Sequence, residues 1–191
     1  MKGICFKENL FNQIIHAEKT QTRRLTKGKK SRFAIDDIVY LKEPYQFNYH
    51  LVQNAIDCEP TQNDVVYKFV NPPSVSEMLE EKWENKLFMP EKFARYFIKI
   101  TGVKKQKLHE ITEIDAIKEG VEFSRPIPAG FKNYVTPSKF FDKTKTYKVD
   151  SFKKEYSGAE MSFLSLWETI NKGNVFEENP EIYVYDFEVL S

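Results

Sequence analysis

Residues 11–24 read FNQIIHAEKTQTRR, and the division of this segment into an apolar and a basic half indicates how the chain begins to fold. Its first half spaces apolar side chains at helical intervals, which predicts a helix that is N-capped by Asn9 and ends near Glu18. Its second half, from Lys19 to Arg24, is polar and basic, and we expect it to follow the helix as a loop. A solvated loop is the simplest interpretation of a basic run that continues for several residues further.

Outward from this stretch, β-branched and aromatic residues gather in short runs that predict strands. The expected strands are 3–7, 37–45, 65–70, 96–103 and 182–190. Helical spacing predicts helices at 74–86, 111–120 and 161–170, the second of them with Thr112 and Asp115 as a capping box and Gly120 as its C′ residue. The segments 46–62 and 122–158 keep no period of 2 or 3.6 and are expected to be excursions. The irregular alternation of strands and short helices predicts an α+β fold built on a small barrel of five to six strands.

Composition limits what the chain can be. With 191 residues, 41% of them hydrophobic, it has enough apolar material for one core, so we expect a single domain, 1–191. Its two cysteines and three histidines have no metal-ligand spacing, and we expect neither a metal nor a cofactor. The N-terminal residues lack the apolar region of a signal peptide and no later run has transmembrane length, which predicts a cytoplasmic protein without membrane contact.

The charge balance restricts any nucleic-acid binding to a local surface. Lysine and arginine total 29 against 28 for aspartate and glutamate, so the chain is not a bulk polycation that coats nucleic acid unspecifically.

Several motifs carry a resemblance to a known family. Lys19, Thr22 and Arg24 match the G-x-K-x-x-T-x-R signature that follows a helix in ASCH domains, with Ala17 in place of the usual glycine. Two further stretches resemble the second strand and the E-G helix of that family: DIVYLKE (37–43) and ITEIDAIKEGV (111–121). The segments MPEKFAR (89–95), LWETIN (166–171) and NP (179–180) resemble an ASCH-like subgroup common in phages and prophages.

The resemblance implies a PUA-like fold, a pseudo-barrel with helices at its rim and a cleft lined by the K-x-x-T segment. It implies binding of RNA or of a modified nucleoside or nucleotide. Small members of the family are amidohydrolases that remove the acyl group from N4-acetylcytidine, and their catalytic Lys, Thr and Glu correspond to Lys19, Thr22 and Glu119.

The residue types suit this chemistry. Threonine and lysine can supply a nucleophile and its base, provided that Lys19 is neutral, which requires a lowered pKa. Glu119 lies in the last turn of a helix, where the macrodipole disfavours a carboxylate. It therefore either pairs with Lys19 or serves acid–base chemistry, and a solvated surface glutamate is the simpler alternative.

Other residues are candidates for ligand contact. The planar guanidinium groups of Arg24 and Arg23 can bind phosphate or a carbonyl oxygen, although exposed arginines near a turn are the alternative. Glu43 ends an apolar strand, and a role in a binding site and a role in the scaffold are equally good interpretations of it. Arg95 precedes a strand, so fixing the strand entry is at least as good an interpretation as ligand contact.

Three functions stay open at this point. The first is RNA or nucleoside binding around the K-x-x-T segment, and the second is amide hydrolysis of an N4-acylated cytidine-like substrate. The third is a phage-associated protein-interaction module whose contacts are made by the 122–158 excursion, where aromatic residues alternate with lysines.

Overall fold

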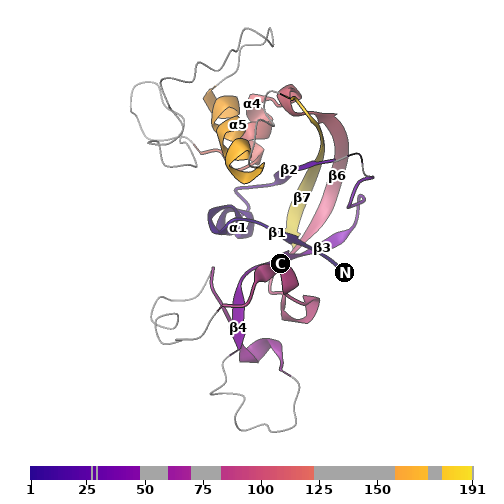
Figure 1. The fold of residues 1–191 in the computed structure, drawn as a ribbon. Coiled ribbons are helices and arrows are strands. Elements are labelled where there is room, and N and C mark those ends of the chain that lie inside the picture. The colour runs from indigo at the N-terminus through magenta and orange to yellow at the C-terminus, as the bar shows by residue number, and fades with distance from the viewer. Residues whose placement is uncertain are drawn as a thin grey trace. The chain divides into compact units, whose positions relative to one another are not determined.

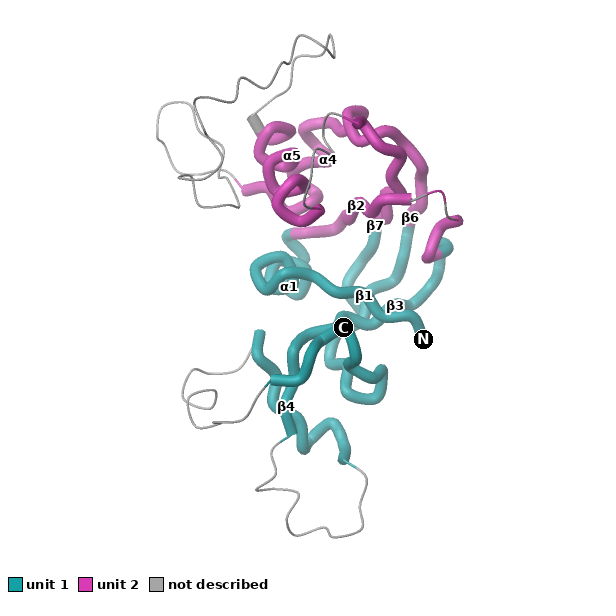
Figure 2. Tube along the Cα trace, in the orientation of Figure 1, with its two compact units in different colours: residues 1–18, 34–101, 187–191 teal, residues 19–33, 102–186 magenta. Residues whose placement is uncertain are grey.

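We describe a computed structural model of the chain, covering residues 1–26, 28, 30–47, 60–69, 83–122, 158–171 and 178–190. These residues group into two compact units, which Figure 2 shows in different colours. Unit 1 consists of residues 1–18, 34–101 and 187–191, and unit 2 consists of residues 19–33 and 102–186. Each unit is described by itself below.

The described residues of unit 1 form strands, 3₁₀ turns and a helix near the N-terminus (Figure 1). Its elements are β1 (Lys2–Cys5), α1 (Glu8–Ile15), β3 (Ile38–Lys42), β4 (Tyr45–Phe47), β5 (Val65–Tyr67), the first part of β6 (Phe97–Lys107), and the 3₁₀ turns Gln62–Asp64, Lys86–Phe88 and Glu91–Phe93. β1 pairs with β3 in parallel, β3 pairs with β6 in antiparallel orientation, and β4 and β5 form a separate antiparallel pair. A cluster of buried aromatic and apolar side chains packs around β4 and β5: Tyr40, Tyr45, Val65, Tyr67, Met89, Phe93 and Ala94.

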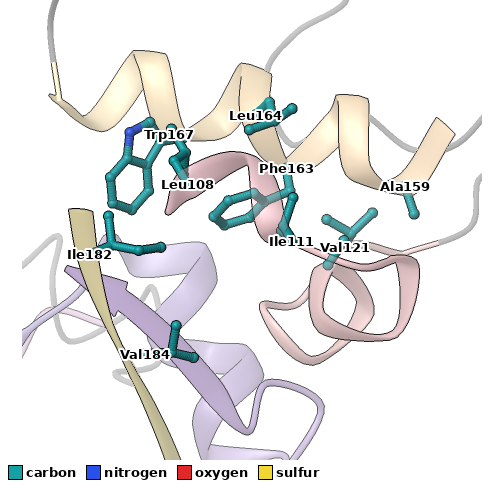
Figure 3. Packing of buried hydrophobic residues seen from close by; sticks show 10 residues of the cluster. Leu108, Ile111, Val121, Ala159, Phe163, Leu164, Trp167, Ile182 and Val184 are labelled. Atoms are coloured by element: carbon teal, nitrogen blue, oxygen red, sulfur yellow. The ribbon is translucent and has the colours of Figure 1, made fainter. Parts of the chain in front are cut away.

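The described residues of unit 2 form strands and helices that contact each other. Its elements are β2 (Gln21–Leu25), the rest of β6, most of β7 (Glu181–Leu190), the 3₁₀ turn Leu108–Glu110, α4 (Glu113–Lys118) and α5 (Gly158–Asn171). β2 pairs with β7 in antiparallel orientation. Figure 3 shows the core of this unit, in which Phe163 and Trp167 of α5 pack with Ile111 near α4 and with Ile182 and Val184 of β7.

The strand order of the larger sheet is β1-β3-β6-β7-β2, and the mixture of parallel and antiparallel pairs with separate helices makes the fold α+β, as predicted. In the described residues this sheet does not close into a barrel. No helix in the described part of the chain is long and apolar enough to cross a membrane.

The structure corrects two expectations near the N-terminus. The first helix is not capped by Asn9: it begins at Glu8 with Lys7 as N-cap, and no side chain caps it. Its start is set instead by packing, because Phe6 and Leu10 are both buried.

The basic stretch is a strand and not a loop. Gln21–Leu25 forms β2, and Arg23 is buried there because acidic side chains from α4 pair with it. A buried and paired arginine can occupy a strand that the sequence pattern marks as solvent-exposed.

Other expected elements agree with the structure to within a few residues, including the long strand β6 and the helix α5. The run 37–45 is interrupted at Pro44, so β3 ends at Lys42 and β4 begins at Tyr45. Most of the expected helix 74–86 and of the two excursions, 46–62 and 122–158, lies outside the described residues.

Candidate functional site

The turn after α1 leads the chain toward Lys19. Ala17 has a φ of 57°, in the left-handed region, and its N–H donates to the carbonyl of Ile14 at 2.9 Å. The N–H of Glu18 donates to the carbonyl of Gln13 at 2.9 Å. This pair of bonds is a Schellman motif, whose left-handed position is usually glycine. The alanine therefore holds the conformation for which the family signature has glycine.

A second Schellman motif ends α4 and orients Glu119. Gly120 has a φ of 94°, and its N–H donates to Ile117 at 2.8 Å, while the N–H of Val121 donates to Ala116 at 3.2 Å. This confirms Gly120 as the C′ residue, and Glu119 is the C-cap. The N-terminal side of α4 has the predicted capping box.

The last carbonyl groups of α4 receive donors from the segment that precedes β2. The N–H of Thr20 donates to the carbonyl of Lys118 at 2.9 Å, and the ammonium of Lys19 donates to the carbonyl of Glu119 at 2.8 Å. Helix ends leave such carbonyls without intrahelical partners, and a cation is favourable there. The C-terminal end of α4 therefore binds the ammonium of Lys19.

The Lys19 ammonium has three oxygen acceptors. Besides the Glu119 carbonyl, it donates to the backbone carbonyl of Gln21 at 2.7 Å and to Oε2 of Glu119 at 2.5 Å. Three donors facing three acceptors match the charged form of the side chain. Burial nevertheless lowers the pKa of Lys19 below its usual 10.5; the nearby Arg24 and Arg23 lower it further, while Glu119 raises it.

Arg23 joins the same carboxylate to a second one. Its Nη1 donates to Oε1 of Glu119 at 3.2 Å, and its Nη2 lies 3.0 Å from Oδ2 of Asp115. The guanidinium also lies 5.4 Å from the centre of the Phe163 ring, and the side chain has no solvent exposure. Residues 19, 21 and 23 follow the period of a strand, which explains why they meet α4 on one side of β2.

Gln21 connects these charges through its amide. Its Nε2 donates to Oδ1 of Asp186 at 2.6 Å and to Oδ1 of Asp115 at 3.3 Å, and its Oε1 accepts from Nη1 of Arg23 at 2.5 Å. A side chain at Gly102 would place a Cβ 2.8 Å from Oδ2 of Asp186, so the glycine leaves room for that carboxylate.

We call the set Lys19, Gln21, Arg23, Asp115 and Glu119 the buried charge network. Two cations and two carboxylates lie in it with at most 8% of each residue exposed. Removing such charges from water costs several kcal/mol per ion, and apolar side chains of similar size often stabilise a fold equally well. A buried network of this kind is consequently a candidate functional site.

Burial by itself raises the pKa of Asp115. The charges of Arg23 and Lys104 and the hydrogen bonds from Gln21 and Thr112 act in the opposite direction and bring that pKa below its usual 3.8. Asp115 is therefore held as a carboxylate by its neighbours.

Thr22 and Arg24 belong to the other face of β2, because side chains alternate along a strand. Thr22 is buried and Arg24 is half-buried. Among the described residues, the contacts join Lys19 to Glu119 and do not join Thr22 to either of them.

The remaining predicted site residues, Glu43 and Arg95, form a separate cluster in unit 1. Nε of Arg95 donates to Oε1 of Glu43 at 3.1 Å, and its Nη2 donates to Oε1 and Oε2 at 2.9 and 2.8 Å. The guanidinium stacks 3.8 Å from the centre of the Tyr67 ring. Glu43 is fully buried, and burial raises its pKa above the usual 4.5 although Arg95 lowers it.

Sequence reasoning missed Gln21 and Asp186 and gave Asp115 only a capping role. If the stretch is taken as a strand, residues 19, 21 and 23 share one face, and this alternation could have indicated that Gln21 lies beside Lys19 and Arg23. No local pattern could have found Asp186, because its partner Gln21 lies 165 positions away in the chain.

In the part of the chain that the structure describes, no group of three or more His, Cys, Asp or Glu side chains is arranged to hold a metal ion. No protein-family model, no curated protein and no solved structure matches this chain.

Proposed function

We propose that this chain is an ASCH-like domain that binds RNA or a modified nucleoside beside the buried charge network of unit 2. One observation carries the proposal: Lys19 and Glu119, which lie 100 positions apart, meet at 2.5 Å inside the unit. These are two of the three residues that the resemblance assigns to the catalytic set, and Lys19 belongs to the segment that it places at the cleft. The proposal includes a PUA-like fold, and the α+β class of the structure, with its mixed sheet, is in line with such a fold.

The geometry favours binding over hydrolysis. All three N–H groups of the Lys19 ammonium already face oxygen acceptors, so the charged form is the one that fits. The Thr22 hydroxyl, which would act as nucleophile, belongs to the opposite face of β2. A network that fixes backbone carbonyls and carboxylates suits the recognition of a polar base, whose hydrogen bonds need rigid partners.

Titration calorimetry with N4-acetylcytidine tests the proposal. We expect the wild type to bind this nucleoside and the variant Glu119→Gln to bind at least tenfold more weakly, because the carboxylate holds both Lys19 and Arg23. Lys118→Gln is the matched control: it changes an exposed neighbour in the same turn and should bind as the wild type does. Circular dichroism checks that each variant is folded. If titration with N4-acetylcytidine, with cytidine and with a short single-stranded RNA each gives no heat of binding, the proposal is wrong.

A second candidate function is amide hydrolysis of an N4-acylated cytidine-like substrate. The observation in its favour is the burial of Lys19, because burial lowers the pKa of the ammonium and a neutral lysine is the form that can accept a proton from a nucleophile. Here Glu119 would receive or return the proton through its contact with Lys19. Absorbance of N4-acetylcytidine over time is the measurement. Turnover that disappears in both Lys19→Met and Thr22→Ala but persists in Lys118→Gln is the expected result; turnover that is absent in the wild type excludes this function.

The third function, protein interaction through residues 122–158, concerns a segment that lies almost wholly outside the described residues.

A further inference from the structure

Unit 1 contains a cationic and aromatic surface that the proposed function does not use. Arg95, Tyr96, Phe69 and Lys86 are all half-buried, which leaves part of each side chain in contact with solvent. We call these four residues the Arg95 patch. Their contacts link them through the fully buried Phe11, whose ring packs edge-on against Phe69 at 5.2 Å and against Tyr96 at 5.7 Å.

The buried carboxylate of Glu43 fixes the orientation of Arg95 in this patch. Glu43 accepts three hydrogen bonds from Nε and Nη2 of Arg95, and a backbone hydrogen bond from Phe69 also reaches it. The guanidinium carbon of Arg95 lies 3.8 Å from the centre of the Tyr67 ring, and Glu43 occupies the Nε and Nη2 side of the group. The side chain of Arg95 keeps 21% of its surface exposed.

Such an arrangement is preorganised for a ligand. Holding a long side chain in one conformation before binding reduces the conformational entropy lost on binding. A buried glutamate is a costly way to stabilise a fold, whereas it is an effective way to fix the plane of an arginine. A guanidinium that is held in one orientation can donate hydrogen bonds to a phosphate.

The neighbouring groups favour the same kind of ligand. The ammonium of Lys86 lies 5.4 Å from the centre of the Phe69 ring, and the Arg95 guanidinium lies 5.2 Å from the centre of the Tyr96 ring. Cations that alternate with aromatic rings are the surface that single-stranded nucleic acids bind, since the rings stack on bases and the cations contact the backbone.

We infer that the Arg95 patch is a binding surface for single-stranded nucleic acid, with bases stacked on its aromatic rings and backbone phosphate at Arg95 and Lys86. This inference rests on the proposed function only for the class of ligand, because every residue that carries it belongs to unit 1. It therefore has its own test.

The test is fluorescence anisotropy of labelled single-stranded RNA and DNA 12-mers, titrated with wild type and variants at several salt concentrations. Tyr96→Leu keeps an apolar side chain but removes the aromatic ring, and we expect it to weaken binding by roughly five- to hundredfold. Lys86→Gln keeps a donor for the carbonyl of Phe6 but removes the charge, and it should reduce the slope of log affinity against log salt by about 0.7.

Both variants leave the Glu43–Arg95 pair in place. Neither of them therefore leaves the buried Glu43 carboxylate without its cation, which would destabilise the protein. Arg95→Lys tests the planar group directly, with thermal unfolding as a check that the variant is folded. The matched controls lie in unit 2: Tyr183→Leu and Lys118→Gln change a half-buried tyrosine and an exposed lysine and should bind as the wild type does.

The outcomes separate this inference from the proposed function. If patch variants bind the 12-mers as tightly as the controls, or if the wild type binds neither RNA nor DNA, the inference is wrong. N4-acetylcytidine binding that depends on Glu119 would still support the proposed function in that case. Conversely, 12-mer binding that depends on Tyr96 and Lys86 supports the patch even where the nucleoside does not bind.

Discussion

Lys19 is a buried cation whose stability depends on each of its oxygen partners. Only 2% of the residue is exposed, and its ammonium contacts two backbone carbonyls and one carboxylate. The arrangement satisfies the charge without water, which is the condition under which a buried ion pair persists in a protein.

We predict that Lys19→Met destabilises the protein by about 3 kcal/mol or more, because it leaves the Glu119 carboxylate buried with only Arg23 beside it. Urea unfolding followed by circular dichroism measures the change. The double variant Lys19→Met/Glu119→Gln should recover part of the loss, since it removes the uncompensated charge as well. A Lys19→Met variant as stable as Lys118→Met would mean that the ammonium is not buried as described.

Ala17 offers a second test at the residue scale. Its left-handed φ of 57° costs an L-residue about 1 kcal/mol or more, whereas glycine adopts this conformation freely. We predict that Ala17→Gly stabilises the protein by about 0.5 to 1 kcal/mol, measured by urea unfolding. Gly120→Ala is the reciprocal change at φ 94° and should destabilise. Equal losses for both substitutions would contradict the Schellman geometry at Ala17.

Elements with local signals were the ones that sequence could predict. The capping box of α4 and its terminal glycine were readable because both depend on residues within one turn of each other. Strand β2 was not readable, since its polar sequence becomes a buried strand only through carboxylates that lie about a hundred positions away. The start of α1 was misplaced for a related reason: burial of Phe6 and Leu10 decided it, and not a capping side chain.

The capping box gives a prediction for α4 as an element. The hydroxyl of Thr112 accepts from the N–H of Asp115 at 3.2 Å, and the Asp115 carboxylate accepts from the N–H of Thr112 at 3.4 Å. We predict that Thr112→Ala costs about 1 kcal/mol of unfolding free energy and that Thr112→Ser, which keeps the hydroxyl, costs much less. Chemical denaturation of the two variants is the comparison. Identical losses would show that the hydroxyl does not cap the helix.

At the scale of the whole molecule, the network gives stability a dependence on pH. The folded state lowers the pKa of Asp115, so its contribution is present above the usual value of 3.8 and is lost as pH falls through the lower, folded value. We predict that wild-type stability decreases below about pH 4 and that Asp115→Asn makes this decrease shallower. Urea unfolding at a series of pH values measures both slopes. A steeper decrease in the variant would contradict the pairing of Asp115 with Arg23.

The α+β class and most element positions followed from periodicity and turn residues. The candidate site followed only in part: Lys19 and Glu119 were indicated by the resemblance to ASCH domains, while the connection through Gln21 depends on how β2 packs against α4. Side chains alternate along β2, so Thr22 lies on the opposite face of the strand from the side that faces Glu119. The K-x-x-T motif did not indicate this separation, because the segment was expected to be a loop.

A two-dimensional ¹H–¹⁵N NMR titration of the protein with N4-acetylcytidine is the most direct test of the proposed binding site. If the nucleoside binds beside the buried charge network, the amide signals of Gln21, Arg23, Glu119 and Gly120 should shift together and saturate with one affinity. The exposed surface at Phe88 in unit 1 should stay unchanged. Signals of unit 2 that do not move at saturating nucleoside, or shifts confined to residues away from this network, would contradict the proposed binding site.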